Sequence, residues 1–535
     1  MRRIAVFLSA NQGGTTRNIV PDLCIRRSAR CSSFFILFIE RSMNMLFPSK
    51  EEVKKLLTNY KTVPVFHETL IDSATPVRLF AGLREKYDNC FILESVDNTE
   101  QWGRYSFIGI DPKKEIKIFG DKAEITTDGK TENVECPDPI ALYNSILAEH
   151  TSPVFPNKPK LTGGLIGYFG YDTVRSFEKK LTNIPEDDLR MPDSNMFLYD
   201  EIVAYDHLSN KAVIIVNINA GEDVDTAYEN AYAKAHDIEK VLKNCPAVES
   251  AESSGNGADL EVKSNFTKEE YMAIVEKGKE HIKNGDISQI VLSQRFEIAN
   301  PPKPFDVYRM LRSTNPSPYL YFFDHKDYCF AGASPEMLVS VTDGVVVTKP
   351  IAGTMPRGKT EEEDKAYENR LVNDIKERSE HTMLVDLGRN DIGRVCKLGS
   401  VNVTDFMRVE RYSKVMHLVS DVQGQLADDK TAMDALMSVL PAGTLSGAPK
   451  VRAMQLIDEL ENKKRGLYGG TVGYLGFSGN IDTCIAIRTV LFKNDKAYVQ
   501  AGAGIVYDSV AETEYEETQN KALAVVNAVR EAAKL

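Results

Sequence analysis

Short strand-like runs that follow one another through most of the chain constrain its fold more than any other feature. NCFILESV and KAVIIVNI alternate with Gly, Asn and Asp turns between about 60 and 245, and runs such as SQIVLSQRFEI and KAYVQAGAGIVYD continue this pattern later. Longer helical patterns occur at about 361–387, 430–439, 449–460 and 511–533. Because the strands do not alternate strictly with helices, the pattern predicts an α+β fold, in which large mixed or antiparallel sheet layers carry flanking helices.

The first 44 residues differ in composition from the rest of the chain. Residues 1–44 contain seven arginines and no lysine, a composition typical of an organelle transit peptide. The alternative is that translation begins at Met43 or Met45, directly before the amphipathic pattern EEVKKLL. In either case we expect an N-terminal extension that is disordered. The apolar run at 34–39 is far shorter than the roughly 20 residues of a membrane span.

A second change of composition divides the remaining chain. Residues 246–262 are rich in Ser, Gly, Ala and Glu and contain little that a core could bury, so we interpret them as a linker. This linker separates a region at 45–245 from a region at 263–535.

Charge and cysteine content exclude several classes of protein. A formal net charge of -12 argues against nucleic acid and against anionic membranes as general partners. The eight cysteines contain no CxxC pair, so neither a disulfide framework nor a cysteine-based zinc site is predicted. These features favour a cytoplasmic location, with organelle targeting as the alternative if the first 44 residues are translated.

Two helical patterns in the second half each carry a pair of glutamates at i and i+3. Glu377 and Glu380 lie in KERSEHTMLVDLGRND, and Glu514 and Glu517 lie in the last helical pattern. In a helix such a pair lies about 60° apart on one face. Solvated helix faces explain many such charges. The alternative is a shared hard cation, because magnesium takes oxygen ligands and needs only one or two carboxylates.

The stretch QAGAGIVYDS precedes the last helical pattern. Gly502 and Gly504 lack side chains that would keep an anion from the backbone N–H groups, although such stretches are more often structural. Neither this stretch nor the second Gly-rich turn, PAGTLSGAPK at 441–450, matches the phosphate-loop pattern with its GK[ST], so neither turn supports nucleotide binding. The chain has no GxSxG elbow, HExxH motif or dinucleotide-type GxGxxG after a strand, which argues against serine hydrolase, zinc protease and dinucleotide chemistry.

Ten motifs in a common order resemble the chorismate-utilising enzymes, and within them the anthranilate synthase component I branch. They include GDISQIVLSQRF, ASPEML, KPIAGTMPRG, LPAGTLSGAPKVRAM, DTCIAIRT and EYEETQNKA, and the resemblance covers about residues 60–530. It implies a Mg²⁺-dependent lyase that converts chorismate and ammonia to anthranilate and pyruvate through aminodeoxyisochorismate, the first step of tryptophan biosynthesis.

The resemblance also implies roles for individual residues. Magnesium would be held by Glu380 and Glu517, with Glu377 and Glu514 in or beside its coordination shell. Glu336 would be the general acid that assists loss of the C4 hydroxyl, and His381 would serve the second step as a base or as a packing residue. The implied substrate-binding positions are Gly353, Thr354, Tyr468, Arg488, Gly502, Ala503, Gly504 and Gln289.

Two positions discriminate among members of this family. Isochorismate and salicylate synthases carry a water-activating lysine where this chain has Gln289, and aminodeoxychorismate synthases commonly carry a nucleophilic lysine where it has Ala352. Alanine cannot form a covalent adduct. The chain also lacks the GxCxG elbow of glutaminases, so the resemblance implies ammonia supplied by a glutamine amidotransferase subunit in a hetero-oligomer.

A regulatory signature completes the resemblance, which implies a regulatory region at 45–245 and a catalytic region at 263–535. The positions that match a tryptophan pocket are Ser95, Asn315, Pro318, Tyr319 and Leu320, with L-tryptophan as the expected feedback inhibitor. Two other functions stay open at this point. The chain could be an aminodeoxychorismate synthase component, or a non-catalytic regulatory subunit that binds tryptophan.

Overall fold

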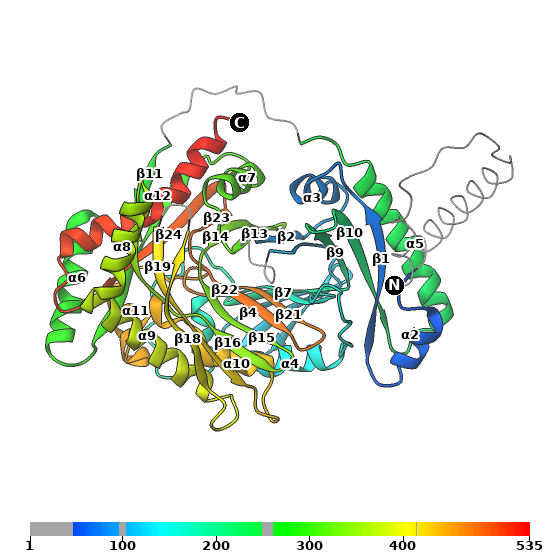
Figure 1. Cartoon of the computed structure of the whole chain (residues 1–535), viewed down its shortest axis with the longest axis horizontal. Helices are drawn as coiled ribbons and strands as arrows, with labels where there is room; N and C mark the ends of the chain where they lie inside the picture. Colours follow the sequence, from blue (N-terminus) through cyan, green and yellow to red (C-terminus); the bar gives the residue numbers. More distant parts are fainter. Residues whose placement is uncertain (1–45, 96–102, 249–259, 413–414) are drawn as a thin grey trace, which may run out of the picture. The chain divides into compact units, whose positions relative to one another are not determined.

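Two antiparallel sheets of 12 strands each are the frame of the part of the chain that the computed structural model describes, residues 46–95, 103–248, 260–412 and 415–535. Helices cover the outer faces of these sheets (Figure 1). The arrangement confirms the predicted α+β fold class. The predicted extension at 1–44 and most of the predicted linker lie outside the described residues.

The first sheet spans both halves of the sequence. Its strand order is β1 (Thr62–Leu70), β10 (Lys211–Asn219), β9 (Glu201–Asp206), β3 (Tyr105–Ile110), β2 (Cys90–Glu94), β13 (Tyr319–Asp324), β14 (Cys329–Ser334), β23 (Thr489–Lys493), β24 (Lys496–Ile505), β12 (Gln289–Ala299) and β11 (Val262–Ser264), with β20 (Gly447–Ala448) paired to β12.

The second sheet mixes the two halves in the same way. Its strand order is β17 (Ile351–Pro356), β19 (Val415–Gln425), β16 (Val345–Thr348), β15 (Met337–Thr342), β22 (Ile481–Ile485), β21 (Thr471–Gly476), β7 (Gly164–Phe169), β8 (Ser194–Tyr199), β4 (Lys114–Phe119), β5 (Lys122–Thr127) and β6 (Lys130–Glu135), with β18 (Asn402–Arg411) paired to β19.

The helices form the outer layers. Their bounds are α2 (Lys50–Leu56), α3 (Pro76–Arg84), α4 (Pro139–Ala148), α5 (Val224–Lys243), α6 (Lys268–Lys283), α7 (Pro304–Thr314), α8 (Glu361–Asn373), α9 (Ile375–Gly393), α10 (Ala432–Val439), α11 (Lys450–Leu460) and α12 (Ala511–Ala532), with 3₁₀ turns η1 (Tyr171–Ser176) and η2 (Gly443–Leu445). None of the described helices combines the length and apolarity that a membrane span requires.

Buried apolar side chains hold the layers together. One cluster lies between the sheets, where the rings of Tyr168 on β7 and Phe330 on β14 meet edge to face with centroids 5.7 Å apart. A second cluster lies between the first sheet and helices that include α3, α5, α7 and α12, and a third lies between the second sheet and α4, α9 and α10. The result is a helix–sheet–sheet–helix arrangement built by burying one face of each element.

Strands from the two halves of the sequence pair directly. β2 pairs with β13 so that Glu94 faces Leu320, and β7 pairs with β21 so that Gly167 faces Gly473. Residues 46–535 therefore form one compact unit. The division of labour between a regulatory region at 45–245 and a catalytic region at 263–535 stays a prediction.

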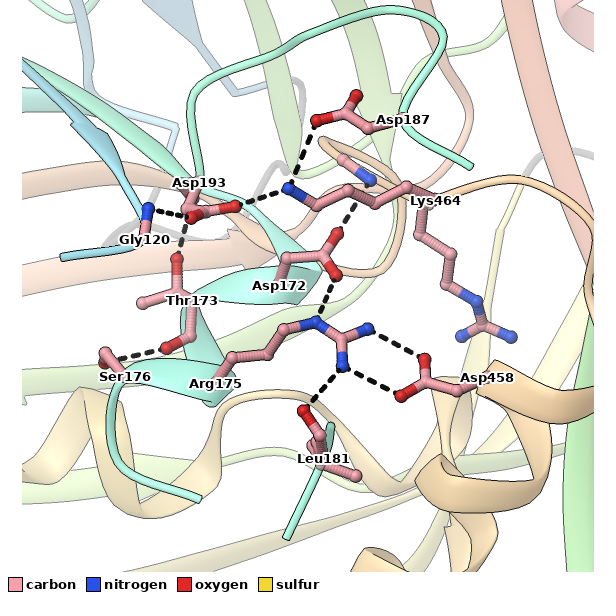
Figure 2. A network of polar contacts seen from close by, with 12 residues as sticks. Gly120, Asp172, Thr173, Arg175, Ser176, Leu181, Asp187, Asp193, Asp458 and Lys464 are labelled. Atoms are coloured by element: carbon pink, nitrogen blue, oxygen red, sulfur yellow. Dashed lines mark hydrogen bonds and ion pairs between the residues drawn. The ribbon is translucent and has the colours of Figure 1, made fainter. Parts of the chain in front are cut away.

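A buried polar network ties the segment around η1 to α11 and to the loop that follows it (Figure 2). Arg175 makes two hydrogen bonds to the Asp458 carboxylate, at 2.8 and 2.7 Å, and one of 2.8 Å to Asp172. Lys464 donates to Asp193 at 2.8 Å from the same loop. Because this loop leads to Tyr468, the network positions one wall of the cavity described below.

Arg175→Met is expected to destabilise the fold by about 3–5 kcal/mol, because it removes the ion-pair partner of the buried Asp458 carboxylate and one of the two cations, with Lys464, that act on buried Asp172. The Asp172 and Asp458 side chains are only 1% and 3% exposed. Urea unfolding followed by circular dichroism measures the change. Arg389→Met is the matched control, since Arg389 pairs with Asp386 at the surface and its loss should cost less than about 1 kcal/mol. Equal midpoints for the two variants would contradict this role.

Candidate functional site

A cavity of about 790 Å³ lies between one end of each sheet and two helices from the second half of the sequence. Its walls come from β12 and β24 of the first sheet, β17 and β19 of the second, and α9 and α12. α12 packs on β24, whereas α9 packs on β17 and β19. Helices from two different layers therefore face one space.

The four predicted glutamates line this cavity together. Glu377 and Glu380 lie on α9, and Glu514 and Glu517 lie on α12. The helical run predicted at 361–387 is in fact two helices, because Asp374 ends α8 and caps α9 by accepting from the Glu377 N–H. This break places Glu377 in the first turn of α9, next to the cavity.

Burial and mutual repulsion act on these carboxylates. Burial first, and then the charges of Glu380, Asp374 and Glu517, raise the pKa of Glu377. Burial also raises the pKa of Glu380 and of Glu514, and Glu517 adds to both shifts. Among the described residues, no three of these carboxylates have oxygens within 4.8 Å of one another. The acids surround a common space without closing into a tight cluster.

Gly502 and Gly504 lie at the end of β24, in a strand rather than a turn. Opposite them on β12, the N–H groups of Val291 and Ser293 donate away from β24, to Ser446 and Glu461. In an antiparallel pair, two opposite residues whose N–H groups point away from each other's strand form a non-hydrogen-bonded pair. The N–H groups of Gly504 and Gly502 therefore also point away from β12. β23 pairs with β24 only up to Val499, and so both glycines present N–H groups at an open edge.

Side chains from other elements come close to these glycines. A methyl group at Gly502 would lie 2.8 Å from the Tyr468 hydroxyl oxygen, and one at Gly504 would lie 3.1 Å from Nε2 of Gln289. Lys521 of α12 donates to the Gly502 carbonyl at 3.0 Å and to Oε1 of Glu517 at 2.6 Å. The open edge of β24 is thereby joined to the acidic helix.

Arg488, Gly353 and Thr354 also reach the cavity. Arg488 has a left-handed backbone, with φ of 53°, and its guanidinium donates to the Lys521 carbonyl. Gly353 has φ of 67°, and a methyl group there would lie 3.1 Å from Oε2 of Glu377. These contacts bring β17 directly against the first turn of α9.

Glu336 lies at the inner wall of the cavity, directly before β15. Its side chain is partly exposed, and loss of hydration raises the pKa of its carboxyl to about 7, against an opposing hydrogen bond from the Thr444 hydroxyl at 3.0 Å. A carboxyl with such a pKa is protonated in a large fraction of molecules near neutrality, which suits a proton donor.

Two of the predicted residues do not line the cavity. His381 is fully buried on the other face of α9, where Nε2 lies 2.6 Å from the Ser420 hydroxyl and burial lowers the pKa of the imidazole to about 4. Ala503 points its methyl group into the cluster formed with Ile274 and Ile505. The neighbours of each residue reach the cavity because strand and helix periodicities send adjacent side chains in different directions.

A second cavity of about 440 Å³ lies between the facing sides of the two sheets. Four of the predicted effector residues line it, namely Ser95, Pro318, Tyr319 and Leu320, whereas Asn315 caps the end of α7 and does not. Asp482 on β22 also faces this space, and the Tyr319 hydroxyl donates to its Oδ1 at 3.0 Å. Burial raises the pKa of Asp482 to about 7.

Sequence reasoning missed Lys521, Thr444 and Asp482. Lys521 could have been found, since it lies four residues after Glu517 and so on the same helix face. Thr444 and Asp482 lie within the motifs LPAGTLSGAPKVRAM and DTCIAIRT, but no local pattern in these motifs indicates what their side chains contact. Their roles depend on contacts between segments that are distant in the sequence.

A family model described as chorismate binding enzyme matches residues 88–527, and the chain belongs to this family. It is 48% identical over 496 residues to anthranilate synthase component 1 of Acetivibrio thermocellus, covering 92% of this chain and 100% of that protein. It is 46% identical to the protein of the same name from Pseudomonas aeruginosa, covering 90% and 98%.

Solved structures support the same family assignment. Anthranilate synthase component I from Streptococcus pneumoniae TIGR4 superposes with a TM-score of 0.70 at 43% identity, covering 81% of this chain and 94% of that one. The menaquinone-specific isochorismate synthase from Escherichia coli has a TM-score of 0.65 at 17% identity, covering 90% and 98%, and shares the fold.

Proposed function

We propose that the chain is the chorismate-converting component of an anthranilate synthase, which forms anthranilate and pyruvate from chorismate and ammonia. The observation that carries this proposal is one cavity lined by four glutamates, Arg488, the open edge of β24 and Glu336. The names of the similar proteins support it. The test is product analysis with chorismate, ammonium and Mg²⁺. Formation of anthranilate is expected, and a 4-amino product would instead identify an aminodeoxychorismate synthase component.

Magnesium fits the donor set of the acidic wall. Glu377, Glu380 and Glu514 are all only partly exposed, and the hard oxygen ligands that they offer suit Mg²⁺. We propose that Glu380 and Glu517 hold the ion, with Glu377 and Glu514 beside it. When bound, Mg²⁺ would cancel negative charge and polarise a substrate carboxylate.

The protein's own groups would orient the dianionic substrate. The N–H groups of Gly502 and Gly504 suit a ring carboxylate, since strand-edge donors form a preorganised anion site. The guanidinium of Arg488, beside the Tyr468 hydroxyl, suits the enolpyruvyl carboxylate, because its planar fork matches a carboxylate. Lys521 adds positive charge beside the open edge of β24, where its ammonium group donates to the Gly502 carbonyl.

Chemistry would proceed in two steps. Glu336 donates a proton to the C4 hydroxyl, which leaves as water while ammonia attacks C2 of the ring. Loss of the C2 proton then breaks the C3–O bond, and the released enolpyruvate becomes pyruvate as the ring becomes aromatic. His381 would act in this second step by positioning α9, since its ring contacts Ser420 and not the cavity.

Ammonia would come from a separate glutamine amidotransferase subunit, because the chain has no glutaminase elbow. Gln289 lies beside the open edge of β24, and an amide there does not activate water as a lysine would. A hetero-oligomer in the cytoplasm is the corresponding assembly. The test is glutamine-dependent turnover, which should require the added subunit, whereas ammonium-dependent turnover should not.

The second cavity would bind L-tryptophan as a feedback inhibitor. Its apolar wall from β13 and β21 suits an indole ring, and Asp482 suits the ammonium group of an amino acid.

Asp482→Asn is expected to weaken tryptophan inhibition at least tenfold, because an ionic hydrogen bond contributes about 1.5–3 kcal/mol. Since the raised pKa is about 7, inhibition of the unaltered protein should also weaken as the pH falls below 7 and Asp482 takes up a proton. Inhibition curves at several pH values measure both effects. Asp495→Asn, in an exposed turn, is the control. Unchanged inhibition in Asp482→Asn would remove this residue from the effector contact.

A further inference from the structure

A second group of metal-ligating side chains lies far from the acidic cavity, in the first half of the sequence. His67 on β1 and His236 and Glu239 on α5 offer one ligand atom each, and these atoms lie within 4.8 Å of one another. It is the one cluster of at least three such residues with this spacing in the described parts of the chain. Neither the cysteine pattern nor the family resemblance points to it.

Local structure explains why the three side chains converge. His236 and Glu239 are three residues apart on α5 and so share one face of the helix. α5 packs along β1 and β10 (Figure 1), and β1 turns the His67 side chain toward it. The two imidazole rings have centroids 4.7 Å apart. A helix and a strand thus contribute to the same point.

One carboxylate oxygen is shared by both rings. Oε2 of Glu239 lies 3.1 Å from Nε2 of His67 and 3.0 Å from Nδ1 of His236. The other oxygen, Oε1, accepts from the Thr69 hydroxyl at 2.6 Å and from the Lys243 ammonium at 2.7 Å. These contacts orient the carboxylate in the way that outer-sphere hydrogen bonds orient metal ligands.

The far sides of the two rings have no hydrogen-bond partner among the described residues. Nδ1 of His67 and Nε2 of His236 are buried there without a donor or acceptor in reach. The near side of each ring contacts the Glu239 carboxylate instead. The nitrogens placed to bind an ion are therefore Nε2 of His67 and Nδ1 of His236, which both face Oε2 of Glu239, and the far nitrogens point away from this position.

The two nitrogen–oxygen separations are close to those of a tetrahedral zinc site, and the two nitrogens lie within 4.8 Å of each other. Zinc binds imidazole nitrogen and carboxylate oxygen at about 2.0–2.2 Å, which places neighbouring ligand atoms roughly 3.3–3.5 Å apart. The two nitrogen–oxygen distances need to grow by only a few tenths of an ångström. His236 and Glu239 are 24% and 12% exposed, so an ion and a water ligand can reach the site from solvent.

We propose that His67, His236 and Glu239 bind a divalent transition-metal ion of the zinc type, which fastens α5 to β1. Two imidazoles and one carboxylate select zinc over magnesium, because magnesium prefers oxygen ligands alone. Lys243 is 55% exposed and can turn into solvent when the ion binds. The ion would tie α5, which covers one outer face of the first sheet, to the edge strand of that sheet.

The test is zinc binding to the full-length, metal-stripped protein in excess Mg²⁺, which keeps the oxygen-rich cavity out of the measurement. Competition with a chromophoric chelator gives stoichiometry and affinity, and thermal unfolding gives the effect on stability. One zinc ion per chain and a higher unfolding midpoint are expected. Both should be lost in His236→Asn, with at least a tenfold weaker affinity, and in Glu239→Gln.

The controls distinguish binding at this cluster from binding at surface histidines. His281→Asn removes a histidine that pairs with Asp286 at the surface, 2.6 Å away, and should leave zinc binding unchanged. His236→Asn alters a partly exposed residue, so it avoids the folding risk of replacing His67, which is 1% exposed. Absence of bound zinc, or equal binding by His236→Asn, would show a hydrogen-bonded cluster only and overturn the proposal. Neither result depends on catalytic activity.

Discussion

Glu336→Gln is expected to lower ammonium-dependent turnover by about 100- to 10,000-fold, the range over which a positioned general acid contributes. Glutamine is similar in size but cannot give a proton to the departing C4 hydroxyl. KM for chorismate should change little, because Glu336 does not contact the carboxylates in the proposed binding mode. Steady-state kinetics with chorismate, Mg²⁺ and ammonium provide the measurement, and an unchanged kcat would exclude Glu336 as the acid.

The pH dependence of kcat tests the role of Glu336 independently. The pKa of Glu336 is raised to about 7, so the protonated donor is present below this pH and kcat should fall about tenfold per unit above it. The Thr444 hydroxyl bond favours the ionised form and lowers the pKa. Thr444→Val should therefore move the alkaline limb to higher pH while keeping the maximum rate similar. If the alkaline limb of the pH profile did not move in Thr444→Val, that limb would reflect the titration of a group other than Glu336.

Glu380→Gln is expected to remove magnesium-dependent turnover, with a fall of about 1,000-fold at fixed Mg²⁺. Loss of one carboxylate ligand removes charge stabilisation of several kcal/mol, and each 1.36 kcal/mol or so is a factor of ten in rate. Kinetics over a range of Mg²⁺ concentrations should show a higher half-saturating concentration as well as the lower rate.

Glu512→Gln is the matched control for this change. Glu512 lies on the same helix as Glu514 and Glu517, but it is exposed and pairs with Lys268 at 2.6 Å, outside the cavity. Its replacement should leave the magnesium dependence as it was. Tryptophan binding should survive in both variants, because the second cavity is lined by other strands. If Glu380→Gln behaved like Glu512→Gln, Glu380 would not be a metal ligand.

Much of the fold could be predicted because its signals are local. Runs of apolar residues between Gly, Asn and Asp turns specify strands whatever the partner strand is, and the α+β class follows from their order. The four glutamates were predictable for the same reason, since i and i+3 spacing places each pair on one helix face. The zinc-type cluster was not found, because His67 is about 170 residues from the other two ligands and the histidine on a strand carries no pattern of its own.

The sequence alone therefore determined the element types, the fold class and the two acidic helix faces, all of which depend on neighbours within a few residues. Only the tertiary structure decided that both halves share each sheet, that Asp374 divides one predicted helix into two, and that His381 is turned away from the cavity. The tertiary structure also placed Thr444 beside Glu336 and Asp482 beside Tyr319. The physical reason is that burial, and the pKa shifts it causes, depend on which distant segments exclude water from a group.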